Sequence, residues 1–161
     1  MRINTGLSIS VQANTDLWQS EVFAARGFVR GASNPASVGN ISEIQLFNPI
    51  GSGKTIRVKR VFSANGATFA ANIRSHNTAL ATLVGSGFNL QFGSAAGVGE
   101  IRTATPVAED GTLIAPWFAT GSTTVEVFSD WATQLDAGEG LIVSGGGANI
   151  QVITDFYWNE V

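Results

Sequence analysis

The sequence predicts an all-β fold, a jelly-roll-like antiparallel β-sandwich with an extended N-terminal arm. From residue 41 onward, apolar and polar residues alternate over short stretches with the two-residue period of a β-strand. Turn-forming residues separate these stretches, and the 161-residue chain contains 19 glycines, as expected for many strands joined by tight turns. Because no convincing amphipathic helix of about 12 or more residues appears, roughly eight to ten short strands are the expected elements.

We divide the chain into an N-terminal arm, residues 1–40, and a jelly-roll-like β-sandwich domain, residues 41–161. Residues 15–25 fit helical spacing, but their apolar positions fit short strands equally well, and both alternatives stand. A free tail rarely carries large apolar side chains, so we expect the arm to dock on its own domain or on a neighbouring chain. The side chains in question are those of Trp18, Phe23 and Phe28.

The strand candidates follow one another along the domain. They span residues 44–48, 55–63, 68–75, 79–84, 88–92, 100–105, 112–118, 123–129, 141–144 and 149–160. Over 55–63 the even-numbered residues from Ile56 to Phe62 are expected on one face of the strand and the odd-numbered ones on the other. Asn65-Gly66 supplies the two positive-φ residues of a type I′ turn, which predicts a tight hairpin to the next strand.

The last candidate strand, residues 149–160, carries large apolar residues on both faces. One face takes every second residue from Ile150 to Trp158, and the other includes Ile153 and Tyr157. We therefore expect this strand in the centre of a sheet or under a neighbouring subunit.

The composition excludes several classes of protein. Apolar residues make up 44% of the chain and charged residues only 13%, against about a quarter in typical domains, which argues against disorder and favours a surface partly covered by a partner. The absence of cysteine excludes disulfides and thiolate metal sites. The start of the chain lacks the apolar run of a signal peptide, and no stretch has the ~20 apolar residues of a membrane helix, so we expect no membrane association and no standard export.

The charge is distributed unevenly along the sequence. Residues 1–102 carry a net charge of +5 and residues 103–161 a net charge of −8. If strands from both halves interleave in one sandwich, this asymmetry averages out in space. The alternative is that faces of opposite sign meet between subunits.

Residues 51–55, Gly-Ser-Gly-Lys-Thr, match the end of a phosphate-binding P-loop. That motif needs a glycine five residues before Gly53, where Asn48 stands, and a helix after the Lys-Thr pair. The following residues alternate as a strand, so we interpret the segment as a hairpin loop without nucleotide binding.

The sequence predicts no enzyme, no cofactor and no metal site. His76 is the only histidine and lacks a nucleophile motif, which favours a polar residue at a strand end. Further histidine or cysteine ligands for zinc are absent. The acids Asp130, Asp136 and Glu139 do not have the spacing of a calcium-binding loop.

The only basic cluster comprises Lys54, Arg57, Lys59 and Arg60. Nucleic-acid binding needs a domain-wide positive surface, and the net charge of −3 opposes it. Arg57 and Lys59 share a predicted strand face, where they could protect a sheet edge or meet an acidic neighbour.

Several segments carry a characteristic combination of turns and strands. They are Ile44-Gln45-Leu46-Phe47-Asn48-Pro49 with Gly51-Ser52-Gly53-Lys54, Val58-Lys59-Arg60-Val61, Asn77-Thr78-Ala79-Leu80, Gly138-Glu139-Gly140-Leu141 and Phe156-Tyr157-Trp158-Asn159-Glu160. Together they resemble a family of small structural proteins of tailed-bacteriophage virions, over roughly residues 26–161. The resemblance implies a jelly-roll-like protein of the particle, either a head decoration (cement) protein or a tail or fibre component, without catalytic residues.

We therefore expect a capsid decoration protein that is made in the bacterial cytoplasm, becomes part of the virion and binds between major capsid subunits, as a homotrimer. The expected protein interface comprises Trp18, Val22, Phe23, Phe28, Arg57 and Lys59. One alternative is a tail, neck or fibre protein of the same virion. Another is a carbohydrate-binding jelly roll that presents Trp117, Trp131 or Trp158 to a sugar.

Overall fold

The computed structural model describes residues 24, 26–35, 37–119 and 123–161, and these residues form eleven strands and no helix. The strands are β1 (Gly27–Asn34), β2 (Ile41–Phe47), β3 (Ile56–Asn65), β4 (Phe69–His76), β5 (Thr82–Ser86), β6 (Phe88–Asn89), β7 (Glu100–Ala104), β8 (Thr112–Ala119), β9 (Val125–Leu135), β10 (Gly140–Ala148) and β11 (Val152–Glu160).

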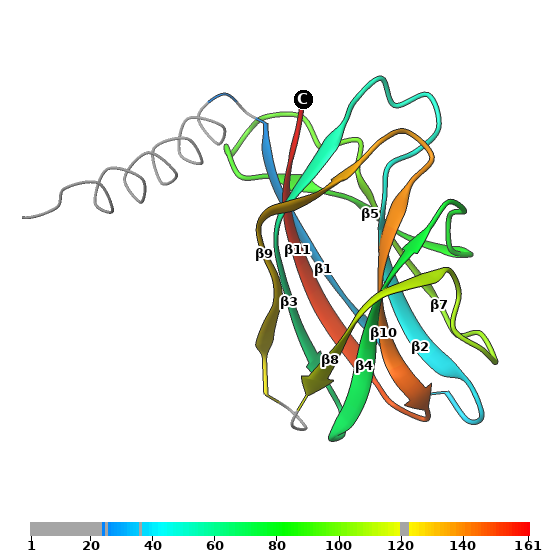
Figure 1. The fold of residues 1–161 in the computed structure, drawn as a ribbon. Coiled ribbons are helices and arrows are strands. Elements are labelled where there is room, and N and C mark those ends of the chain that lie inside the picture. Colours follow the sequence, from blue (N-terminus) through cyan, green and yellow to red (C-terminus); the bar gives the residue numbers. More distant parts are fainter. Residues whose placement is uncertain (1–23, 25, 36, 120–122) are drawn as a thin grey trace, which may run out of the picture.

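The strands form two antiparallel sheets that pack face to face (Figure 1). The five-stranded sheet has the order β6-β1-β11-β3-β9, and the six-stranded sheet has the order β5-β7-β2-β10-β4-β8. This arrangement confirms the predicted all-β sandwich. It also places β11 in the centre of its sheet, one of the two positions predicted for the last strand.

Eight of the strands pair in a nested order. Strand β4 pairs with β8, β3 with β9, β2 with β10 and β1 with β11, so each pair encloses the one before it along the chain. The chain alternates between the two sheets from β1 to β4 and again from β8 to β11. Such a rolled, nested ribbon is the topology of a jelly roll, as predicted.

The remaining strands, β5 to β7, come from a segment inserted between β4 and β8, residues 77–111. They extend both sheets at the same side of the sandwich: β7 pairs with β2, β5 pairs with β7, and β6 pairs with β1. We call residues 77–111 the inserted segment.

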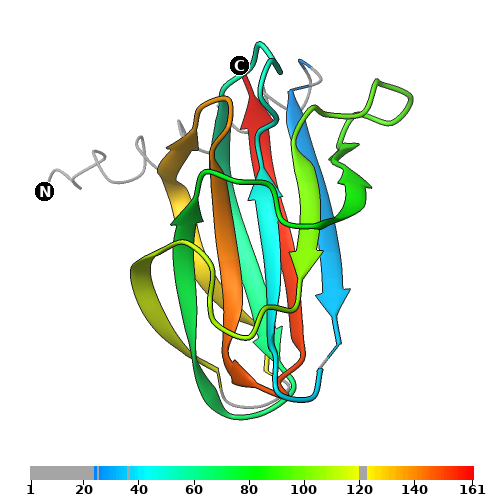
Figure 2. The same ribbon diagram turned by 90° about the vertical axis from the view of Figure 1, so that its right-hand side faces the viewer.

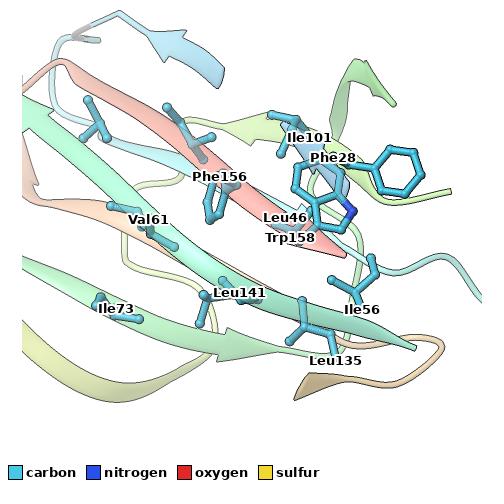
Figure 3. Packing of buried hydrophobic residues seen from close by; sticks show 14 of the residues in the cluster. Phe28, Leu46, Ile56, Val61, Ile73, Ile101, Leu135, Leu141, Phe156 and Trp158 are labelled. Atoms are coloured by element: carbon cyan, nitrogen blue, oxygen red, sulfur yellow. The ribbon is translucent and has the colours of Figure 1, made fainter. Parts of the chain in front are cut away.

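The core lies between the sheets and is continuous along them (Figure 3). Phe156 and Trp158 of β11 are fully buried, and Phe28 of β1 stacks on Trp158 with ring centroids 6.1 Å apart. Fully burying a side chain of this size stabilises the folded state by about 1.5–3 kcal/mol. Of the two faces of the last strand, the one that carries every second residue from Ile150 to Trp158 is buried.

The predicted alternation over residues 55–63 is correct only for the first half of β3. Tyr157 lies opposite Arg60 and Trp158 opposite Val58, so Lys59 is an extra residue in a β-bulge. The bulge reverses the faces: Val61 enters the core, whereas Arg60 and Phe62 do not.

The predicted hairpin at Asn65-Gly66 is wrong. Strands β3 and β4 belong to different sheets, so the chain crosses the sandwich here instead of folding back. Neither Asn65 nor Gly66 has a positive φ, and the Gly66 N–H donates to the Gln151 carbonyl at 2.9 Å. The loop at residues 51–55 likewise connects two sheets, β2 to β3, and is not a hairpin loop.

The domain boundary at residue 41 also needs correction. Strand β1 pairs with β11 along its whole length, so the sandwich begins at Gly27 and the end of the predicted arm belongs to it.

The two halves of the sequence interleave in both sheets. Arg60 and Glu126 come within 3.4 Å, as do Arg74 and Glu109 within 3.1 Å, and each pair joins the positive half of the chain to the negative half. The positive and negative halves of the sequence therefore lie side by side within one folded chain, and the charge asymmetry averages out in space.

Candidate interaction surface

Two loops of the inserted segment cross the outer face of the six-stranded sheet (Figure 2). The first, residues 77–81, covers Gln45 of β2. Its side chain donates from Nε2 to the Thr78 carbonyl at 3.0 Å and accepts the Leu80 N–H at 2.9 Å. Because Gln45 and Leu80 are buried, this contact seals one half of the face.

The second loop, residues 105–111, is attached by charged hydrogen bonds. The Glu109 carboxylate accepts from Asn72 Nδ2 at 2.7 and 2.9 Å, from an Arg74 guanidinium nitrogen at 3.1 Å and from the Ser144 hydroxyl. Arg74 also donates to the carbonyls of Asp110 and Gly111, at 2.6 and 2.8 Å. The loop is thus held to both β4 and β10.

Glu43 of β2 lies fully buried under this second loop. One of its oxygens accepts the Asp110 N–H at 2.9 Å, and among the described residues the other has no hydrogen-bond partner. Burial raises the pKa of Glu43 to about 8, with further raising by the Asp110 and Glu109 carboxylates; the Asp110 N–H and Arg74 act in the opposite direction. The group is protonated at neutral pH and, being enclosed, is closed to a substrate in solution.

A shallow groove of about 400 Å³ lies beside the loops and is lined by Asn34, Ala81, Thr82 and residues 103–106. None of these lining residues titrates near neutral pH. The Asn34 amide donates to the Glu43 and Ala104 carbonyls at 3.0 and 2.6 Å, so it supports the backbone. Within the described ranges, no group of three acidic or histidine side chains is placed to hold a metal ion.

The inserted segment also exposes large apolar side chains where it passes from one sheet to the other. Leu83 and Val84 of β5 are 51% and 40% exposed, Phe88 of β6 is 63% exposed, and Phe92 in the next loop is completely exposed. We call these four residues the interaction surface. Aromatic residues in such positions are typical of sites that contact another protein.

Arg30 of β1 holds part of this surface in place. Its guanidinium donates to the carbonyls of Ser86 and Val84 at 2.7 and 3.1 Å, and its Cζ lies 4.7 Å from the centre of the Phe88 ring. A cation over an aromatic face contributes about 0.5–1 kcal/mol at an exposed site. Phe88 is therefore presented in one orientation while most of its ring remains in solvent.

The loop that carries Phe92 is anchored from below by Glu160 of β11. The Glu160 carboxylate accepts the N–H groups of Val98 and Gly99 at 3.0 and 2.9 Å and the Trp158 indole N–H at 3.0 Å. A Cβ on Gly87 would come 2.2 Å from the Trp158 ring, so the chain needs glycine to pass so closely over the core. The segment that carries the interaction surface is thus attached to the sandwich at two places, by Arg30 of β1 and by Glu160 of β11.

The residues predicted from the sequence as a protein interface do not lie together in the structure. Trp18, Val22 and Phe23 lie outside the described residues. Phe28 is only 5% exposed because it belongs to the core, so its assignment to an interface is wrong.

Arg57 and Lys59 both lie on β3, and the structure does not bring them to the interaction surface. Arg57 is exposed on the outer face of the five-stranded sheet, whereas Lys59 is buried at the bulge. Because β3 pairs with both β11 and β9, the suggested protection of a sheet edge is excluded.

Other candidates from the sequence also find their places. His76 ends β4 opposite Gly140, and the Gly-Ser-Gly-Lys-Thr loop leads into strand β3 and not into a helix. Trp117 and Trp158 are buried in the core, so neither is placed to stack on a sugar, and the side chain of Trp131 is outside the described part.

Sequence reasoning missed the interaction surface because Phe88 and Phe92 lie in a stretch that alternates like any half-buried strand, and Leu83 and Val84 end another predicted strand. The one available signal is the density of glycines around them, at Gly85, Gly87 and Gly93. Glycines at such spacing indicate a bending chain with little room to bury its neighbours.

Comparisons with family models, with curated proteins and with solved structures found no match for this chain. None of the described residues belongs to a helix that could span a membrane.

Proposed function

We propose that this chain is a structural protein of a bacteriophage particle, a head decoration protein that binds between major capsid subunits. The observation that carries the proposal is the interaction surface: four large apolar side chains exposed along one segment that is otherwise firmly attached to a jelly roll. The resemblance of several segments to virion proteins supports the same conclusion. The low share of charged residues, 13%, suits a protein that is partly covered by neighbours.

The size of the surface favours binding by several copies at once. Fully burying one large apolar side chain is worth about 1.5–3 kcal/mol, and three of the four residues, all but Phe92, are already partly buried. Association costs at least about 4 kcal/mol in lost freedom of motion. A single copy would bind weakly, whereas three linked copies would gain from avidity, which is consistent with a trimer on the particle.

A pelleting assay with bare heads tests this role. The Phe88→Ser/Phe92→Ser double variant removes the two most exposed aromatic side chains among the described residues, and the matched control, Val38→Ser/Ile153→Ser, removes two other exposed apolar side chains. Wild-type and control protein should sediment with the heads, and the double variant should stay in the supernatant.

Attachment should persist at high salt, because apolar contacts are not screened as ion pairs are. If wild-type protein fails to pellet with heads but pellets with purified tails, the decoration role is wrong and a tail position is correct. If it pellets with neither, the virion role itself is wrong.

The trimer has its own measurement. Light scattering of the isolated protein at micromolar concentration should give about three times the chain mass of 16.8 kDa. A mass of one chain would limit the trimer to the particle.

A further inference from the structure

We propose that residues 15–23 of the same chain cover the interaction surface in the free protein and yield it to capsid subunits on the particle. The second half of this statement rests on the proposed function, whereas the first half concerns the isolated chain alone.

The start of β1, to which the N-terminal segment is joined, lies beside the surface. The Leu90 N–H donates to the Gly27 carbonyl at 2.9 Å, and Val29 lies directly opposite Phe88 in the pairing of β1 with β6. The chain therefore enters β1 next to the strand and loop that carry Phe88 and Phe92. In Figure 2 the upper end of β1 (blue) lies beside the green loop that follows β6.

The distances allow an intramolecular contact. Residues 24–26 span at most about 10 Å when fully extended, and Phe92 is only two residues beyond Leu90. A segment tethered so closely has an effective concentration of the order of millimolar at the surface. A second copy at micromolar concentration competes poorly with it.

The chemistry of the segment matches the surface. Residues 15–23 contain large apolar side chains, and a protein rarely leaves two such groups exposed within reach of each other. They are Leu17, Trp18, Val22 and Phe23. The segment also carries Asp16 and Glu21, and the Arg30 guanidinium, of opposite charge, lies over the Phe88 ring.

The experiment uses the full chain and a spin label, which is convenient because the protein has no cysteine. A nitroxide on Ala95→Cys, an exposed position in the Phe92 loop, should broaden the indole N–H signal of Trp18 in a ¹⁵N-labelled sample. The Trp18→Phe variant identifies that signal. A nitroxide on Val38→Cys, in the exposed loop beyond the far end of β1, is the control and should leave the signal sharp.

Three outcomes decide the proposal. Loss of the Trp18 signal with the Ala95 label, and its recovery when Phe88→Ser/Phe92→Ser is added, support the contact. A sharp Trp18 signal with both labels overturns it. Equal loss in a mixture of spin-labelled ¹⁴N chains and unlabelled ¹⁵N chains also overturns it, because the segment would then reach a second copy.

The readouts separate this inference from the proposed function. A sharp Trp18 signal together with normal pelleting on heads would contradict only the proposal that residues 15–23 cover the interaction surface. A broadened Trp18 signal together with failed pelleting on heads would contradict only the proposed capsid role.

Discussion

The two outer faces of the sandwich differ in how far they are covered. The outer face of the six-stranded sheet is sealed by two loops of the inserted segment, whose attachments include Gln45, Glu43 and Glu109. On the five-stranded sheet, Arg60 and Glu126 form a largely exposed ion pair at 3.4 Å, and Phe62 and Tyr157 make an edge contact with centroids 5.8 Å apart. Polar groups should therefore matter much more for stability on the first face than on the second.

Protonation of Glu43 should give the largest effect. Its native pKa of about 8 lies above the ordinary value of 4.5, so the folded state binds the proton more tightly than the unfolded state. The resulting stabilisation is complete below about pH 4.5 and is lost as the pH rises to about 8, at up to ~1.4 kcal/mol per pH unit. Urea unfolding of wild type and Glu43→Gln between pH 5 and 8 should show that the variant lacks this slope. Parallel pH profiles would contradict the assignment.

Removal of the Glu109 carboxylate should have the next largest effect. Glu109→Ala removes the carboxylate that accepts from Asn72, Arg74 and Ser144 in a partly buried site, which should cost about 2–4 kcal/mol. Chemical denaturation measures this cost. Limited proteolysis should also cut residues 105–111 faster in the variant. An unchanged cutting rate would mean that the loop is held by other contacts.

Gln45→Ala should cost less, about 1–3 kcal/mol, because it leaves the Leu80 N–H and the Thr78 carbonyl without a side-chain partner. Amide exchange provides a local reading: the Leu80 N–H should lose protection in the variant, while that of Asn48, bonded to Glu139, should keep it. Protection lost equally at both amides would indicate global destabilisation instead.

The smallest effect is expected on the open face. Glu126→Ala removes one partner of an ion pair that solvent screens, so the free energy of unfolding should change by less than about 1 kcal/mol. A loss as large as that of Glu109→Ala would show that the two faces do not differ in the way described.

The parts of the fold that were predictable depend on local pattern. The alternation from Ile150 to Trp158 identifies which residues share one face of β11, because a shared face depends only on spacing within the strand. Lys59 has no such signature, since a bulge arises from the pairing with β11 and leaves no mark in residue type. Asn65-Gly66 has the residues of a hairpin turn, yet Asn65 pairs with Val152 from the far end of the chain.

The interaction surface was out of reach for the same reason. Phe28 and Phe88 have the same side chain, and both lie in short strands among glycines. Phe28 faces Trp158 and is buried, whereas Phe88 is in a two-residue strand at the edge of the sheet and is exposed. The two side chains differ in burial because β1 has a paired strand on each side, whereas β6 is at the edge of the sheet. This difference depends on contacts between distant parts of the sequence.

Imaging of decorated heads at near-atomic resolution tests the central claim most directly. We predict three copies of the jelly roll around a symmetry axis, with Phe88 and Phe92 of each copy enclosed against major capsid subunits and the outer face of β3 and β11 left in solvent. A map in which Phe88 and Phe92 point into solvent, while Arg57 and Tyr157 contact the capsid, would contradict the assignment of the interaction surface.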